Sequence, residues 1–152
     1  MARKLVGCLV VVAALGMVAG AATAQFAKPE DAVRYRQSVM LLVGDHFTRM
    51  AAMVKGDAPY DKAAFEKNAV LVDTLYRMPI VEAFTTPGSD KDSRMKADAL
   101  KEKDKITQMH NATQAELTKL VTTAKAGDLG AIKTQFGAAG ASCTACHRAY
   151  RK

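Results

Sequence analysis

The last helical stretch of the sequence, residues 128–150, decides the fold and reads DLGAIKTQFGAAGASCTACHRAY. Its apolar side chains recur at steps that alternate between three and four residues. The stripe comprises Leu129, Ile132, Phe136, Ala139, Cys143, Cys146 and Tyr150. This spacing is typical of a helix that packs one face against its neighbours. The sequence therefore predicts a helix that begins at Asp128 and carries two cysteines on its buried side.

Residues 143–147 of this helix read Cys-Thr-Ala-Cys-His, the spacing typical of covalent attachment of a c-type haem. Two thiols three residues apart on a helix face the same way, about 5–6 Å apart at Cβ. They can therefore add to the two vinyl groups on one edge of a porphyrin. His147 follows directly and can give a ring nitrogen to the iron. We expect one haem c per chain, held by Cys143 and Cys146, with His147 as the metal ligand.

Three other uses of the cysteine pair compete with haem attachment. A thioredoxin-like redox pair belongs in a βαβ setting, which the helical pattern does not provide. A structural zinc site needs four ligands, and His46 and His110 do not form a second ligand pair. A disulfide between Cys143 and Cys146 suits an exported protein, but it explains neither His147 nor the place of the cysteines on the packed face.

Three earlier segments also repeat apolar residues at helical spacing. Helices are expected from Pro29 to Val54, from Asp61 to Met78 and from about Ser93 to Ala126, with a longer connection around residues 85–90. The inner face expected for the first of them is Val33, Gln37, Met40, Gly44, Phe47, Ala51 and Val54. Four amphipathic helices joined mostly by short loops predict an all-α protein, an antiparallel four-helix bundle. Such a bundle can hold haem between facing helices.

The first 24 residues have the layout of a secretory signal peptide. Arg3 and Lys4 precede an apolar run over residues 5–18, and Ala22-Thr23-Ala24 forms a small-residue cleavage site. The run is short for a membrane anchor of about 20 residues, so we expect cleavage. The mature domain is then residues 25–152, in the periplasm and without a membrane segment. Export agrees with haem attachment, which in bacteria takes place after export.

The composition of the mature chain argues against two classes of function. Of 22 basic residues, removal of Arg3 and Lys4 leaves 20 against 15 acidic ones, a net charge of +5. The two signs are interspersed, without a basic block containing aromatic residues, so nucleic-acid binding is not expected. No nucleophile–base set and no carboxylate pair stands out, so we do not predict an enzyme.

Several segments carry a resemblance to a known family. They are residues 30–37 (EDAVRYRQ), 53–61 (MVKGDAPYD), 83–84 with 87–89, 126–128 and 143–151. Over nearly all of residues 25–152 the chain resembles cytochrome c′, the class II c-type cytochromes. The resemblance implies a high-spin, five-coordinate haem with His147 as the only protein ligand. It also implies binding of the uncharged gases NO and CO, and a homodimer packed through the first two helices.

The resemblance further assigns residues around the haem. Arg36 and Gln37 correspond to the pair that contacts the haem propionates, and Asp92 to a loop acid near them. Arg151 corresponds to a basic residue beside the proximal face. The family commonly has a tryptophan early in the third helix; this chain has no tryptophan, and Leu100 takes that place.

Met40, which corresponds to the distal position over the iron, leaves two functions open. A thioether can be a sixth ligand that raises the haem potential and favours electron transfer. The protein would then be a low-spin electron carrier that exchanges electrons with a periplasmic redox partner. Alternatively, Met40 is an apolar plug, and the iron stays open to gases. Residues 35–37 and the Pro87-Gly88-Ser89 loop resemble those of the high-spin members of the family, and this resemblance favours the second interpretation.

Overall fold

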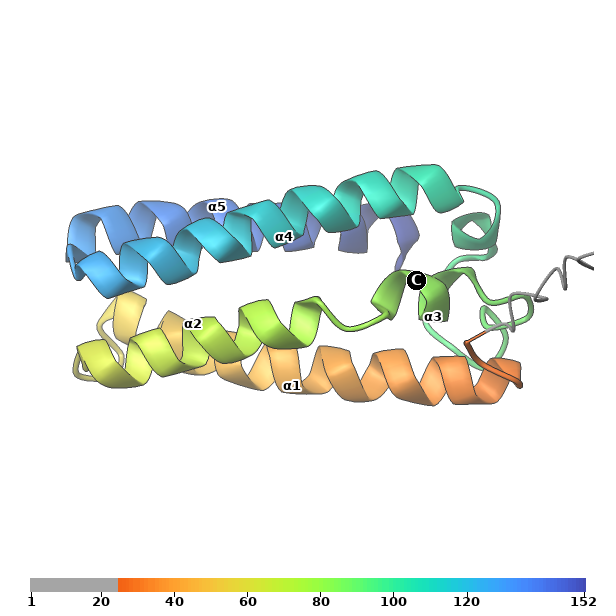
Figure 1. Ribbon diagram of the computed structural model, residues 1–152, viewed down its shortest axis with the longest axis horizontal. Helices are drawn as coiled ribbons and strands as arrows, with labels where there is room; N and C mark the ends of the chain where they lie inside the picture. The colour runs from red at the N-terminus through yellow and green to blue at the C-terminus, as the bar shows by residue number, and fades with distance from the viewer. Residues whose placement is uncertain (1–24) are drawn as a thin grey trace, which may run out of the picture.

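The computed structural model describes residues 25–152; the expected signal peptide, residues 1–24, lies outside the described residues. Four long helices make up the molecule (Figure 1): α1 (Pro29–Lys55), α2 (Lys62–Tyr76), α4 (Lys103–Ala126) and α5 (Leu129–Tyr150). Two short helices, α3 (Ile80–Thr85) and the 3₁₀ helix η1 (Ala97–Leu100), lie between α2 and α4. The predicted antiparallel four-helix bundle is confirmed.

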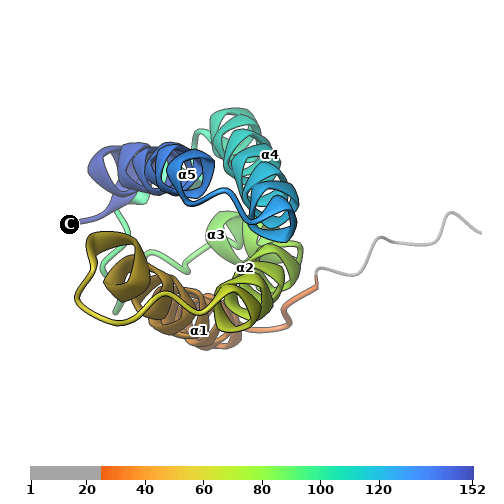
Figure 2. The same cartoon turned by 90° about the vertical axis from the view of Figure 1, so that its left-hand side faces the viewer.

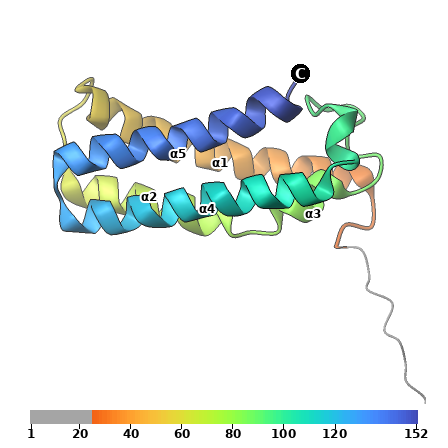
Figure 3. The ribbon, with the colours of Figure 1, turned by 90° about the horizontal axis from the view of Figure 1, so that it is seen from above.

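The helices pack as two antiparallel pairs. α1 lies along α2 and α4 lies along α5, and α2 also packs against α4 (Figure 2). α5 contacts α1 much less than it contacts α4. Seen from above, the C-terminal end of α5 lies beside the connection that contains η1 (Figure 3). Within residues 25–152 no helix combines the length and the apolar character that a membrane crossing requires.

Local sequence signals explain where the long helices begin and end. Asp61 and Asp128 are N-caps whose carboxylates accept hydrogen bonds from the backbone N–H groups of Ala64, at 3.0 Å, and Ala131, at 2.6 Å. Gly56 closes α1 at φ 86°. Gly127 closes α4 in the same left-handed conformation, at φ 83°, which glycine adopts without a steric penalty.

Two hydrophobic clusters form the interior. The main core runs along the bundle and includes the fully buried side chains of Met50, Phe65, Leu117, Leu120 and Ile132. A smaller second cluster lies at the C-terminal end of α5. Its buried members are Met95, Ala99, Ile106 and Tyr150, and Leu100 and Cys146 pack against it.

Two predicted boundaries in the middle of the chain were wrong. The third long helix begins at Lys103 and not at Ser93. The segment before it is held away from helical geometry because the Lys96 N–H donates to Tyr150 O, 2.8 Å away, in place of a helical partner. The second long helix ends at Tyr76, two residues before Met78, and the connection that follows contains the unexpected helix α3.

The predicted inner face of α1 was also partly wrong. Gln37 and Gly44 are exposed. The buried positions are Ala32, Arg36, Val39, Val43 and Met50, and each of them immediately precedes a predicted one. One residue turns a helix by about 100°. The sequence pattern therefore identified a neighbouring face of α1, which the site described next depends on.

Candidate haem site

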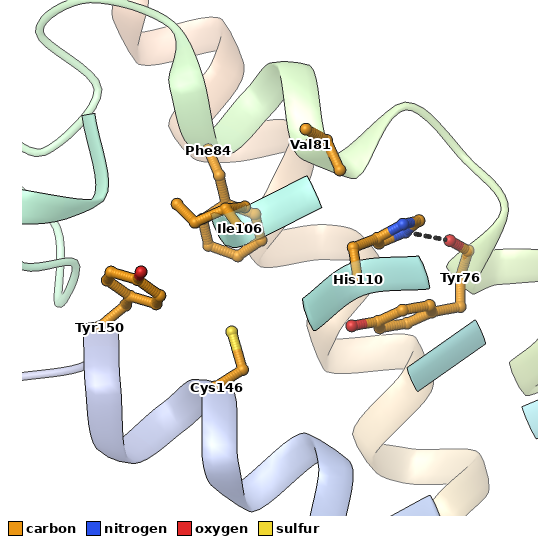
Figure 4. Close-up of a pocket in the computed structure, with 7 residues that line it drawn as sticks. All are labelled: Tyr76, Val81, Phe84, Ile106, His110, Cys146 and Tyr150. Atoms are coloured by element: carbon orange, nitrogen blue, oxygen red, sulfur yellow. Dashed lines mark hydrogen bonds between the residues drawn. The ribbon is translucent and has the colours of Figure 1, made fainter. Parts of the chain in front are cut away.

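Cys143 and Cys146 lie in the last two turns of α5, where the sequence predicts them. Both thiols are free and half-buried. Burial raises the pKa of both, and the neighbouring Cys143 adds to the rise at Cys146. The Cys146 sulfur points from α5 toward a pocket between the helices (Figure 4). The pair thus offers two partly desolvated sulfurs on one helix face, which suits attachment to an apolar group.

The pocket beside Cys146 has a mostly apolar wall that four elements build. Its lining residues are Tyr76, Val81, Phe84, Ile106, His110, Cys146 and Tyr150. The rings of Tyr76 and His110 stack with their planes 10° apart and their centroids separated by 4.7 Å. The walls come from α2, α3, α4 and α5, so α3, which sequence analysis missed, contributes directly. An apolar wall beside two thiols fits the flat, largely apolar edge of a porphyrin.

Only one of the three histidines in residues 25–152 lacks a side-chain hydrogen bond. His46 Nδ1 donates to Asn68 Oδ1, 2.7 Å away. His110 Nε2 donates to Tyr76 O, 2.9 Å away. His147 follows Cys146 directly, and its surface remains largely accessible to solvent. Desolvation of the ring by neighbouring atoms, and then the charge of Arg151, lower its pKa. The neutral imidazole, which is the form that binds metals, is therefore favoured at His147.

The zinc interpretation finds no support in the described part of the chain. No group of three or more histidine, cysteine, aspartate or glutamate side chains comes together in residues 25–152. A structural zinc ion takes four such ligands. The donor set of two thiols and one adjacent imidazole fits haem c instead.

Met40 on α1 lies level with the cysteines of α5. Phe47 of α1 stacks on Phe136 of α5, with ring centroids 4.2 Å apart, and the two helices run antiparallel (Figure 1). Met40 precedes Phe47 by seven residues, and Cys143 follows Phe136 by seven residues. Because the helices are antiparallel, both lie about 10 Å from the aromatic contact in the same direction. Residues seven apart share a helix face, so Met40 faces the side of α5 that carries Cys143. Its half-buried side chain packs against the main core.

Arg36 is buried between α1 and the segment that contains α3. Its Nη1 donates to Ala83 O, 2.9 Å away, and its Nη2 donates to Ser89 O. The guanidinium also lies over the Phe84 ring, 5.5 Å from its centroid. Arg36 therefore fastens α3 and the following loop to α1. The exposed Gln37 is on the face of α1 that Met40 shares, since the two are three residues apart.

Arg151 contacts His147 through its backbone, whereas Asp92 lies in the loop that follows α3. The Arg151 N–H donates to His147 O, 2.9 Å away, and its side chain is exposed. Asp92 is exposed and has φ 50°, a left-handed conformation that aspartate tolerates better than most residues. It lies three residues after Ser89, which Arg36 holds. The contacts of both side chains with haem stay predictions.

Sequence analysis missed three residues that surround this site. Lys96 Nζ reaches the last turn of α5, Glu102 accepts a hydrogen bond from Tyr150, and His110 lines the pocket. The partners of Lys96 and Glu102 are about 50 residues away in the chain, so no local pattern could indicate them. His110 carried a weak signal, since it lies four residues after the apolar Ile106 on the same helix face.

A four-helix bundle with a Cys-x-x-Cys-His motif on its last helix defines a class of c-type haem protein. The family model described as cytochrome C′ matches residues 31–151. The chain therefore belongs to the cytochrome c′ family. This family binds haem c covalently through two cysteines and serves electron transfer and gas binding, without enzymatic activity. Cys143 and Cys146 supply the two cysteines here.

Two cytochromes c′ from other organisms align with this chain over almost their whole length. Cytochrome c′ of Alcaligenes xylosoxydans is 47% identical over 130 residues, which cover 84% of this chain and 98% of the relative. Cytochrome c′ of Rubrivivax gelatinosus is 38% identical over 84% of this chain and 99% of the relative.

Solved structures of cytochrome c′ from Alcaligenes xylosoxidans match the fold as well. A variant with bound carbon monoxide superposes with a TM-score of 0.76 at 44% identity, covering 84% of this chain and 99% of the other. A nitric oxide complex of another variant gives the same TM-score and identity, with 84% and 98% covered.

Proposed function

We propose that this chain is a periplasmic haem protein whose iron is five-coordinate and high-spin, with His147 as its ligand and an open face that binds NO and CO. The observation that carries the proposal is the register of α1 against α5. In this register Met40 faces the side of α5 that carries Cys143, which supports an apolar distal face over the iron. His46 and His110 are engaged with Asn68 and Tyr76, which leaves His147 as the available imidazole.

The side chains divide the work of holding the group. Haem, once attached, supplies an iron that takes up an uncharged diatomic gas. Cys143 and Cys146 fix one edge of the ring to α5, and His147 gives its nitrogen to the iron. Three of the five N–H donors of Arg36 stay available after its two carbonyl bonds, so Arg36 and Gln37 can both meet the propionates. We place Asp92 near them and Arg151 beside the proximal face.

An absorption spectrum tests the proposal directly. The ferrous protein is expected to show a high-spin spectrum that changes on addition of CO or NO. Met40→Ala should keep the high-spin spectrum and speed CO association, because a smaller side chain opens the distal side. Lys133→Ala, at an exposed position of α5 outside the proposed haem site, is the control. A low-spin resting spectrum that Met40→Ala converts to high-spin would contradict the proposal.

A second candidate function, electron transfer, is favoured by the distribution of charge. Residues 90–105 and 147–152, at the end of the bundle that carries His147, contain nine basic and five acidic side chains. The rest of residues 25–152 contains eleven basic and ten acidic side chains. Such a cationic end would steer an acidic redox protein toward the haem. Electron exchange with an anionic redox protein should then slow markedly as salt rises; a salt-independent rate would count against this function.

We also propose that two copies of the chain associate through α1 and α2. The large exposed apolar side chains of the described residues are Leu41, Leu42, Val70 and Met78. All lie on α1, on α2 or just after α2, while α4 and α5 have none among them. One-sided exposure of this kind marks an association surface. Sedimentation should show a dimer that Leu41→Glu converts to monomer, whereas Ala115→Glu on the exposed face of α4 should not.

The periplasmic location is supported by the N-terminal sequence. Mass spectrometry of the exported protein is expected to show a chain that starts at Gln25. Retention of residues 1–24 in the haem-loaded protein would contradict signal cleavage.

A further inference from the structure

The last turn of α5, which carries His147, is fastened to a distant segment of the chain. We name residues 93–96 the strap. The Lys96 N–H donates to Tyr150 O and the Lys152 N–H donates to Arg94 O, each 2.8 Å away. Met95 and Arg151 form an antiparallel bridge between these bonds. The strap therefore pairs with the end of α5 as a short piece of sheet.

The Lys96 side chain adds a charged cap to the same turn. Its Nζ donates to Arg148 O and to Ala149 O, each 3.2 Å away. Carbonyls in the last turn of a helix have no partner within the helix, and they form the negative end of its dipole. Lys96 thus satisfies two of these carbonyls with a positive charge, and they belong to the two residues that follow His147 in the chain.

Tyr150 anchors the turn from the other side. Its side chain is 5% exposed, within the second cluster. Its hydroxyl donates to Glu102 Oε2, 2.7 Å away, and Lys105 Nζ lies 3.1 Å from the same oxygen. The residues after His147 are therefore held by main-chain bonds, by an ammonium group and by a buried ring.

We propose that Lys96 and the strap position His147 toward the haem iron. The proposal rests on the proposed function, in which His147 is the iron ligand. Haem attachment fixes α5 at Cys146, the residue before His147, and the strap fixes the three residues after it. The backbone of His147 is held between these two points, and its carbonyl accepts the Arg151 N–H at 2.9 Å. In this proposal Lys96 acts on His147 through the backbone of α5.

The test compares two variants of the full haem-loaded protein. Lys96→Met keeps the aliphatic stem and removes the ammonium. Lys103→Met makes the same change of charge at an exposed position of α4 and is the matched control. Hydrogen exchange of the Arg151 amide should become about tenfold faster in Lys96→Met, as expected on losing a charged hydrogen bond to the turn. Lys103→Met should leave this rate unchanged.

The second readout concerns the iron. In Lys96→Met the reduction potential should shift, and the histidine–iron stretching band of the ferrous protein should broaden, both relative to Lys103→Met. Tyr150→Phe, which keeps the ring and removes the bond to Glu102, should change both measurements in the same direction. Faster exchange without any change at the iron overturns the positioning role, and so does unchanged exchange.

The outcomes separate this proposal from the function on which it rests. A parent protein without a histidine–iron band contradicts the five-coordinate iron. The reduction potential, which depends on His147 ligation in either coordination state, then decides the role of the strap. The parent protein can instead show the histidine–iron band while Lys96→Met and Lys103→Met have identical reduction potentials. That result overturns only the role of the strap.

Discussion

The two ends of the bundle are built in different ways. At one end, which we call the turn end, α1 passes into α2 and α4 into α5 through short connections closed by Gly56 and Gly127. At the other, the strap end, residues 77–102 form a long irregular connection that holds the C-terminal turn of α5. Short connections close the first end, whereas hydrogen bonds between residues some 50 positions apart hold the second together.

The end of the bundle with the long connection is the one that can host a cofactor. Aromatic packing fills the turn end, where Phe47 stacks on Phe136 and Phe65 meets Phe136 edge-on with centroids 6.4 Å apart. Toward the strap end, α5 instead presents the two thiols and a pocket wall. Buried polar contacts, such as those of Arg36, take over the role of holding the helices together there.

Removal of the thiols should have the largest effect, and only at the strap end. The double variant Cys143→Ser and Cys146→Ser is expected to lose all covalent haem, because no other free cysteine exists in residues 25–152. The mass of the denatured protein measures this loss, with Ser142→Ala as a neighbouring control. A parent chain that lacks the mass of haem and is two hydrogens light would instead support a Cys143–Cys146 disulfide.

Phe65→Ala should be the most destabilising single change at the turn end. Phe65 is fully buried and contacts Tyr60 and Phe136. Truncation of a buried phenylalanine costs about 3–5 kcal/mol of unfolding free energy. Urea unfolding measures it, and Gln108→Ala at an exposed position of α4 should change stability little. A loss below about 1 kcal/mol would show that the aromatic cluster is not needed.

Arg36→Met should cost somewhat less and should act on the strap end. The change leaves Ala83 O and Ser89 O without their donor, at about 2–4 kcal/mol for two buried acceptors. Hydrogen exchange should rise in residues 80–93 more than in α2. Arg34→Met, at an exposed arginine of the same helix, is the control. Uniform acceleration throughout the bundle would contradict a local role.

Gly56→Ala and Gly127→Ala should each cost about 1–2 kcal/mol, the price of a left-handed alanine. A Cβ at Gly56 meets open space, whereas one at Gly127 lies 2.9 Å from Lys62 Cε. That atom is the mobile end of a side chain, so the two variants should differ little. A much larger loss for Gly127→Ala in thermal unfolding would show that Lys62 is fixed.

The smallest expected effect concerns the loss of folding stability at low pH. The hydroxyl of Tyr150 and then the Lys105 ammonium hold the pKa of Glu102 below its ordinary 4.5. A lowered pKa in the folded state adds stability that is fully present above pH 4.5 and is lost as pH falls through the folded pKa. Glu102→Gln should therefore flatten this part of the stability curve, and Tyr150→Phe, which removes the hydrogen bond to Glu102, should flatten it partly. An unchanged loss of stability at low pH would contradict the contribution of Glu102.

Much of the site was readable from sequence because its residues are close together in the chain. Cys143, Cys146 and His147 occupy five consecutive positions, and helical geometry alone sets two thiols on one face. Met40 was readable for a related reason, since its stripe continues to Phe47, which faces α5. The stripe was wrong as the buried face of α1, because α2 and α3 cover the neighbouring side.

The four long helices, the turn end and the haem-attachment motif could be predicted from the amino-acid sequence. Each depends on spacing, caps and glycines that act over a few residues. Long-range contacts set three further features: α4 begins at Lys103, Arg36 fastens α3, and Lys96 caps the turn of His147. These features depend on hydrogen bonds between backbone groups and distant segments of the chain. Every residue has a backbone carbonyl, so the sequence does not show which carbonyl accepts such a bond.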